Sequence, residues 1–168
     1  MEPIASFSLA RHEGPYEQWP PKTPLLFEGQ PTGREIPGYV LEAQYRCSAG
    51  YLLITSQDCP FEESNDFLLL ARDLHVLART RLCAPYRSFL LHAHWPVAEN
   101  ALRLHYGIRD FYTLTVESRR RRPFRRHRLW LVQDEAPERD PRSAESIRAL
   151  EARLEAIDRQ ISDDLRPR

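Results

Sequence analysis

Residues 89–117 read FLLHAHWPVAENALRLHYGIRDFYTLTVE. Apolar side chains recur here at every second position between turn-like breaks, which is the pattern of strands with one buried face. Three successive apolar faces can be assigned: Phe89, Leu91, Ala93 and Trp95, then Leu102, Leu104 and Tyr106, then Tyr112, Leu114 and Val116. Aligning these faces predicts a register, because a slip of one residue would turn every side chain over.

The predicted register pairs apolar residues across neighbouring strands. The pairs are Trp95 with Leu102, Ala93 with Leu104, Leu91 with Tyr106, Tyr106 with Tyr112, and Leu104 with Leu114. The same alignment puts His92, His94, Arg103 and His105 together on the opposite face. We therefore expect one buried face and one polar face in this part of the sheet.

The alternation continues on both sides of this stretch. Further strands are predicted over residues 39–47, 51–57, 67–71, 74–82 and 127–133. About eight strands in antiparallel succession predict a mainly β fold, either an up-and-down barrel or a sandwich.

The apolar spacing changes after residue 134. Residues 134–142 read as a charged linker, and residues 143–165 repeat apolar side chains every three or four positions. This spacing predicts one C-terminal amphipathic helix. Asp140 followed by Pro141 is a favourable start, because a capping carboxylate precedes a proline at the first helical position.

Composition limits the class of protein further. The chain has 168 residues and a hydrophobic fraction of 42%, which suits one domain with a substantial core. Residues 1–38 are rich in proline and predict an irregular arm that packs on the β domain of residues 39–133.

No run of residues has the length needed to cross a membrane, and the three cysteines form no Cys-x-x-Cys pair, as expected of reduced thiols in a cytoplasmic protein. Lys22 is the only lysine among 24 basic residues, a bias typical of GC-rich codon usage that favours a bacterial source.

Histidines form the first candidate site. His92 and His94 lie two positions apart on a predicted strand, and the register places His105 opposite His92. Three imidazoles on one face could hold zinc, iron or a similar divalent metal ion. His92-Ala93-His94, followed after four residues by Glu99, resembles part of the first metal-binding motif of the cupin family. That family has a small β-barrel and often binds a metal through two such histidines, the glutamate and a later histidine, so the resemblance implies a metal-dependent enzyme. The alternative is a solvated outer face that carries histidines without a metal.

Arginines form the second candidate site. Seven arginines fall within residues 119–128, and the candidate contacts are Arg119, Arg120, Arg121, Arg122, Phe124, Arg125, Arg126 and Arg128. Clustered cations could contact phosphates while Phe124 stacks on a base. The formal net charge of the chain is zero, whereas a dedicated nucleic-acid-binding domain is usually basic. The alternative is therefore a solvated loop between two strands.

The predicted helix carries the third candidate site. Its apolar residues follow a heptad seam: Ile147, Leu150, Leu154, Ile157 and Ile161. In a parallel pair of helices, Arg153 of one copy would face Asp158 of the other. The seam either mediates a homodimer or packs on its own sheet over Leu129 and Leu131, as most amphipathic helices do.

Signatures of catalysis are weak. The sequence has no Gly-x-Ser-x-Gly elbow and no glycine-rich phosphate loop, and Cys59 lacks a basic neighbour that would activate its thiol. We therefore expect a non-catalytic protein-binding or adaptor module with no cofactor, whose partner is another protein. Nucleic-acid binding through the arginine run is the first alternative, and a metal-dependent enzyme is the second.

Overall fold

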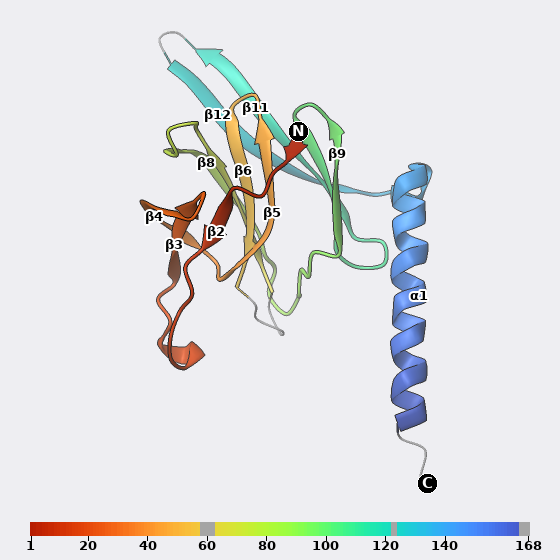
Figure 1. The fold of residues 1–168 in the computed structure, drawn as a ribbon. Coiled ribbons are helices and arrows are strands. Elements are labelled where there is room, and N and C mark those ends of the chain that lie inside the picture. Colours follow the sequence, from red (N-terminus) through yellow and green to blue (C-terminus); the bar gives the residue numbers. More distant parts are fainter. Residues whose placement is uncertain (58–62, 122–123, 165–168) are drawn as a thin grey trace.

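The computed structural model describes residues 1–57, 63–121 and 124–164. Within these residues, strands form three antiparallel sheets and one long helix follows them (Figure 1). The five-stranded sheet has the order β1-β5-β6-β7-β8 and consists of Glu2–Pro3 (β1), Val40–Cys47 (β5), Gly50–Ser56 (β6), Asn65–Leu70 (β7) and Val76–Leu82 (β8). The four-stranded sheet has the order β12-β11-β10-β9 and consists of Ala93–Ala98 (β9), Ala101–His105 (β10), Phe111–Arg121 (β11) and Phe124–Asp134 (β12).

The remaining elements lie at the two ends of the chain. A three-stranded sheet of order β2-β3-β4 consists of Phe7–Leu9 (β2), Lys22–Phe27 (β3) and Gln30–Pro37 (β4). Two short 3-10 helices, Tyr16–Gln18 (η1) and Pro137–Arg139 (η2), and the helix Pro141–Asp164 (α1) complete the structure. No helix in the described part of the chain combines the length and the apolar character needed to cross a membrane.

The prediction of a mainly β protein with one C-terminal helix is confirmed. The chain from β5 to β12 contains eight strands, as the alternation predicts. The sheets of the described residues do not close into a barrel, and they stack as layers in the manner of a sandwich (Figure 1).

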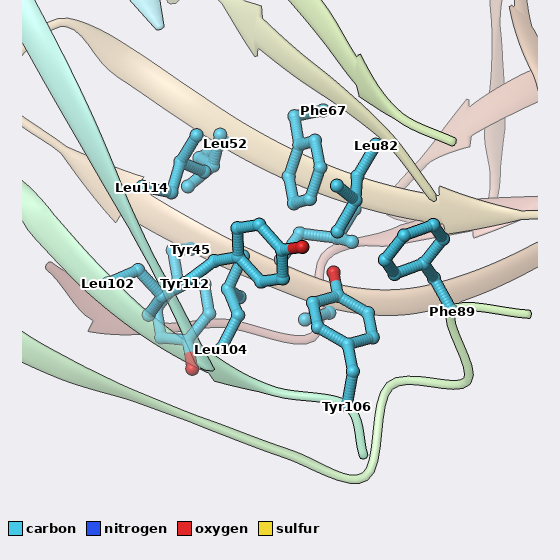
Figure 2. Close-up of a cluster of buried hydrophobic side chains, with 12 residues drawn as sticks. Tyr45, Leu52, Phe67, Leu82, Phe89, Leu102, Leu104, Tyr106, Tyr112 and Leu114 are labelled. Carbon is cyan, nitrogen blue, oxygen red and sulfur yellow. The ribbon is translucent and has the colours of Figure 1, made fainter. Parts of the chain in front are cut away.

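The five-stranded sheet is the middle layer, because its two faces belong to different apolar clusters. On one face, side chains such as Leu52 and Phe67 meet Leu104 and Leu114 of the four-stranded sheet (Figure 2). On the other face, Leu53, Leu68 and Leu70 pack against Phe7, Leu25 and Ile36 of the three-stranded sheet. Every residue of β7 is buried as a result. Its second part, Phe67–Leu70, matches the rule that a strand covered on both faces is apolar at successive positions, whereas Asn65 and Asp66 are buried polar residues.

The N-terminal segment is more regular than its prolines predict. Instead of an irregular arm, it forms the three-stranded sheet on the back of the middle layer. Pro31 and Pro37 lie in β4, which is the edge strand of that sheet, where a missing backbone donor is tolerated. Pro24 lies in the central strand β3, and its carbonyl accepts a hydrogen bond from the amide of Ala10 at 3.0 Å.

The observed register differs from the predicted one on both sides of β10. Strand β9 is shifted by one residue, so that Trp95 pairs with Arg103 and His94 pairs with Leu104. Strand β11 is shifted by two residues, so that Leu104 pairs with Tyr112 and not with Leu114. The second shift keeps each side chain on its face, whereas the first turns all of β9 over.

The one-residue shift of β9 has two physical causes. A bulge between Ala101 and Leu102 displaces the ladder. The outer face of the sheet also carries an apolar cluster, in which Trp95 packs with Phe111 and with Ile147 of α1. Trp95 is buried as predicted, but on the face opposite to Leu104.

Candidate functional site

The helix α1 begins at a side-chain cap. The carboxylate of Asp140 accepts hydrogen bonds from the backbone amide of Ser143 at 2.8 Å and from its hydroxyl at 2.7 Å. These bonds satisfy one of the free amides at the helix start, and they lower the pKa of Asp140 below its usual range. Pro141 follows the cap, so the predicted helix start is confirmed.

Only the first turns of α1 pack against the sheet. Ile147 joins Trp95 and Phe111 on the outer face of the four-stranded sheet, and Arg142 lies with its guanidinium carbon 4.9 Å from the centre of the Trp95 ring. The hydroxyl of Ser146 lies 2.8 Å from Nδ1 of His105. Beyond these turns the helix extends past the ends of the nearby strands (Figure 1).

The heptad seam is therefore divided between two environments. The first part, which we name the proximal pair, consists of Ile147 and Leu150, and their exposed fractions are 8% and 9%. The second part, which we name the distal stripe, consists of Leu154, Ile157 and Ile161, with exposed fractions of 42%, 43% and 52%. Side chains of one apolar stripe thus change from buried to half-exposed within one helical turn.

The predicted packing of the seam over Leu129 and Leu131 is wrong. Both leucines point into the sandwich and pack against the core between the two larger sheets. Trp130 and Val132, the large apolar side chains on the outward face of β12, are exposed. The helix instead contacts the opposite edge of the sheet, where Trp95 lies on β9.

The four candidate metal ligands lie in different places. The rings of His92 and His105 are neighbours on the outer face, with their centres 5.1 Å apart. His94 points into the sandwich, where its Nδ1 lies 2.5 Å from the hydroxyl of Tyr45. Glu99 lies in the turn between β9 and β10, where its backbone carbonyl accepts a hydrogen bond from the N-terminal amine. Among the described residues, no group of three or more His, Cys, Asp or Glu side chains converges in a way that could hold a metal ion.

Burial controls the protonation of these histidines. Burial lowers the pKa of His92, His94 and His105 below the ordinary value for histidine. The charge of Arg153 lowers the pKa of His92 further, and that of His92 lowers the pKa of His105. The neutral imidazole is therefore favoured at all three positions in the folded protein.

The arginine run lies on the hairpin of β11 and β12. The backbone register pairs Arg119 with Arg126 and Arg120 with Arg125, and the hairpin projects beyond the body of the sheets (Figure 1). Arg122 lies outside the described residues, as do the side chains of Arg119–Arg121, Phe124 and Arg125. Arg126 and Arg128 are exposed, and the guanidinium carbon of Arg128 lies 4.5 Å from the centre of the exposed Trp130 ring.

Two contacts were not predicted from the sequence. The alternation marks Trp95 as buried but does not indicate that α1 covers it. The pair of Arg128 and Trp130 could have been found, because residues two apart on a strand share a face.

Comparisons with known proteins give no relative for this chain. No protein-family model matches it, no curated protein matches it, and no solved structure matches it.

Proposed function

We propose that this chain is a non-catalytic protein-binding module whose contact surface is the apolar stripe of α1. The observation that carries the proposal is the distal stripe, where three large aliphatic side chains on one helix face are about half exposed. Apolar side chains grouped on an ordered surface commonly mark a site of protein interaction. An amphipathic helix that presents such a stripe fits an apolar groove or a second helix.

The size of the stripe indicates a modest affinity. Full burial of an exposed aliphatic side chain contributes roughly 1.5–3 kcal/mol. Since Leu154, Ile157 and Ile161 are already about half covered, their combined contribution is about 2–5 kcal/mol before the entropy of association is subtracted. A partner must therefore also use the charged side chains beside the stripe, among them Arg153 and Asp158.

Site-specific photo-crosslinking in the source cells tests the proposal. A benzophenone side chain placed at position 157 samples the distal stripe, and one placed at position 152 samples the opposite face of the same helix. We expect a protein adduct from position 157 that is absent from position 152. The purified adduct partner should then bind the unmodified chain, and Ile157→Asp should abolish binding while Ala152→Asp, with the same added charge, retains it. Equal adducts at both positions, or equal binding by both variants, would reject the proposal.

Nucleic-acid binding remains a second candidate function, favoured by one specific contact. Arg128 stacks on Trp130 at an exposed position of β12, and Arg126 lies two residues earlier on the same face. An aromatic ring beside cations on an open sheet face can hold a base and its phosphates. The arginine hairpin that continues from these residues would extend the positive surface.

A further inference from the structure

The contact between α1 and the sheet is built around one buried histidine. His105 is 0% exposed and its ring stacks on Phe111 with the ring centres 4.0 Å apart. Its Nδ1 meets the hydroxyl of Ser146 from the helix, and its Nε2 is buried with no well-aligned hydrogen-bond partner among the described residues. A neutral ring suits this position, because an added proton at Nε2 would bring a charge into an apolar contact.

The side chains in direct contact with His105, which are Ser146, His92 and Phe111, carry positive charge or none. His92 lies beside it in the segment before β9, and Phe111 and Trp95 are apolar neighbours from β11 and β9. From the helix side come Ser146, Arg142 over Trp95, and Arg153, whose charge acts on His92. The nearby carboxylates are already engaged, since Asp134 pairs with Arg103 at 2.6 Å and Asp140 caps the helix. Backbone carbonyls of Gly107 and Ile108 partly offset the unfavourable environment of a charged His105.

Protonation should therefore weaken the docking of α1. Burial and the neighbouring charges lower the pKa of His92 and His105 in the docked state. The undocked state binds more protons below the ordinary histidine pKa of about 6.5, so docking is complete above that pH and weakens as the pH falls below it. Each histidine can weaken docking by at most about tenfold for each pH unit.

Docking of α1 on the sheet also determines which residues of the heptad seam can contact a second helix. The proximal pair occupies positions a and d of the first heptad, and in the docked state both side chains are buried, with Ile147 against Trp95 and Phe111 of the sheet. A parallel coiled coil would place a second helix where the sheet now lies against Ile147. Docking on the sheet and full-length pairing of two helices are therefore mutually exclusive.

We propose that α1 pairs in parallel with α1 of a second copy of this chain, and that its docking on His105 holds the chain as a monomer until acid releases it. This proposal rests on the proposed function, because it names a second copy of this chain as the partner that binds the apolar stripe of α1. Charge complementarity favours a second copy, because in a parallel pair Arg153 at position g faces Asp158 at position e of the other helix, twice by symmetry. An antiparallel pair centred on Ile157 would instead bring the two Asp158 carboxylates together.

Sedimentation velocity of the full chain at about pH 8 and about pH 5.5 tests the proposal, since this interval spans the ordinary histidine pKa. We expect the wild type to be a monomer at the higher pH and a dimer at the lower one. His105→Phe keeps the ring stack but cannot be protonated, so it should form much less dimer at the lower pH than the wild type does. His75→Gln, at an exposed histidine beside Asp73, should behave as the wild type does.

Two variants open the docked contact without acid. Trp95→Ala removes the surface under Ile147, and Ser146→Arg blocks the contact with His105 while placing a cation opposite Glu151 of a second copy. Whichever of them keeps the circular dichroism of the fold should be a dimer at both pH values, and adding Leu154→Asp should return it to a monomer.

Three outcomes would overturn the proposal. Monomers of both opened variants at every pH would exclude pairing with a second copy. A wild type with the same mass at both pH values would exclude release by acid, and a His105→Phe variant that dimerises in acid as the wild type does would exclude His105 as the group that responds. Crosslinking at position 157 is an independent experiment. If it captures a different protein while sedimentation shows no dimer, the proposed function is supported and the pairing of two copies is rejected.

Discussion

The hydroxyl of Tyr45 and the imidazole of His94 meet inside the sandwich, 2.5 Å apart. Tyr45 lies on β5 of the middle sheet and His94 on β9 of the four-stranded sheet, so the hydrogen bond joins the two layers near the edge where α1 docks. Burial raises the pKa of Tyr45 to about 12, which keeps its hydroxyl protonated and able to donate.

Removing this hydroxyl should destabilise the fold. Tyr45→Phe keeps the ring but leaves the half-buried Nδ1 of His94 without its partner, at a cost of about 1–3 kcal/mol. Denaturant unfolding measures the change. The matched control is Tyr86→Phe, which removes a hydroxyl from a side chain that is 93% exposed and should change stability by less than about 0.5 kcal/mol. Equal midpoints for the two variants would show that the bond contributes nothing.

The free energy of unfolding should decrease in mild acid. The pKa of His92, His94 and His105 is lowered in the folded protein, so the unfolded chain binds more protons below about pH 6.5. Stability is then complete above that pH and falls by at most about 1.4 kcal/mol per pH unit for each histidine. Urea titrations at a series of pH values give the slope, which His94→Gln should reduce. A stability that rises on acidification through this interval would contradict the assignment.

Core leucines and exposed strand residues should respond differently to truncation. Leu104 is fully buried between the two larger sheets, so Leu104→Ala should cost about 2–5 kcal/mol. Val132→Ala lies on the outer face of β12, where the side chain is 60% exposed, and should cost less than about 0.5 kcal/mol. Chemical denaturation of both variants checks the face assignment, which fails if Val132→Ala is the more damaging change.

The stability of the α1 cap should depend on a hydrogen-bond acceptor at position 140 rather than on the charge of that side chain. Asp140→Ala removes the acceptor for Ser143 and should cost about 1 kcal/mol, whereas Asp140→Asn keeps a capping oxygen and should cost much less. Hydrogen exchange of the amides in the first turn of α1 reports the loss directly. Comparable exchange in both variants would mean that the helix start does not depend on this side chain.

Binding of nucleic acid, if it occurs, should weaken steeply as salt increases, because phosphate contacts release counterions. Replacing Arg119–Arg122 with alanine should then lower both the affinity for single-stranded RNA or DNA and the dependence on salt. Trp130→Ala should lower affinity with little change in salt dependence, since a stacked base releases no ion. Arg148→Ala, at an exposed arginine of α1, serves as the control. The absence of any mobility shift at low salt would remove this function from consideration.

Local patterns in the sequence predict much of this structure. Alternating apolar residues predict the eight strands from β5 to β12, and the Asp140-Pro141 pair predicts the helix start, because each depends on contacts between residues close in sequence. The burial of Leu102, Leu104 and Leu114 follows from the same alternation.

Contacts over long distances in the sequence could not be predicted in the same way. Trp95 was placed on the wrong face because the sheet is apolar on both sides where α1 covers it, so the pattern alone does not choose between the two faces. The division of the seam depends on where the sheet ends beside the helix, and the pairing of Tyr45 with His94 joins residues 49 positions apart. Neither leaves a periodic signal in the sequence.

The middle sheet has a consequence for the order in which the protein is made. Its back is covered by Phe7, Leu25 and Ile36, which leave the ribosome before Leu53, Leu68 and Leu70, the side chains that they cover. Until Leu70 has been synthesised, the three-stranded sheet carries an apolar face whose counterpart on the middle sheet is incomplete. The three-stranded sheet can therefore pack on the middle sheet only after the ribosome has produced the strands that it covers.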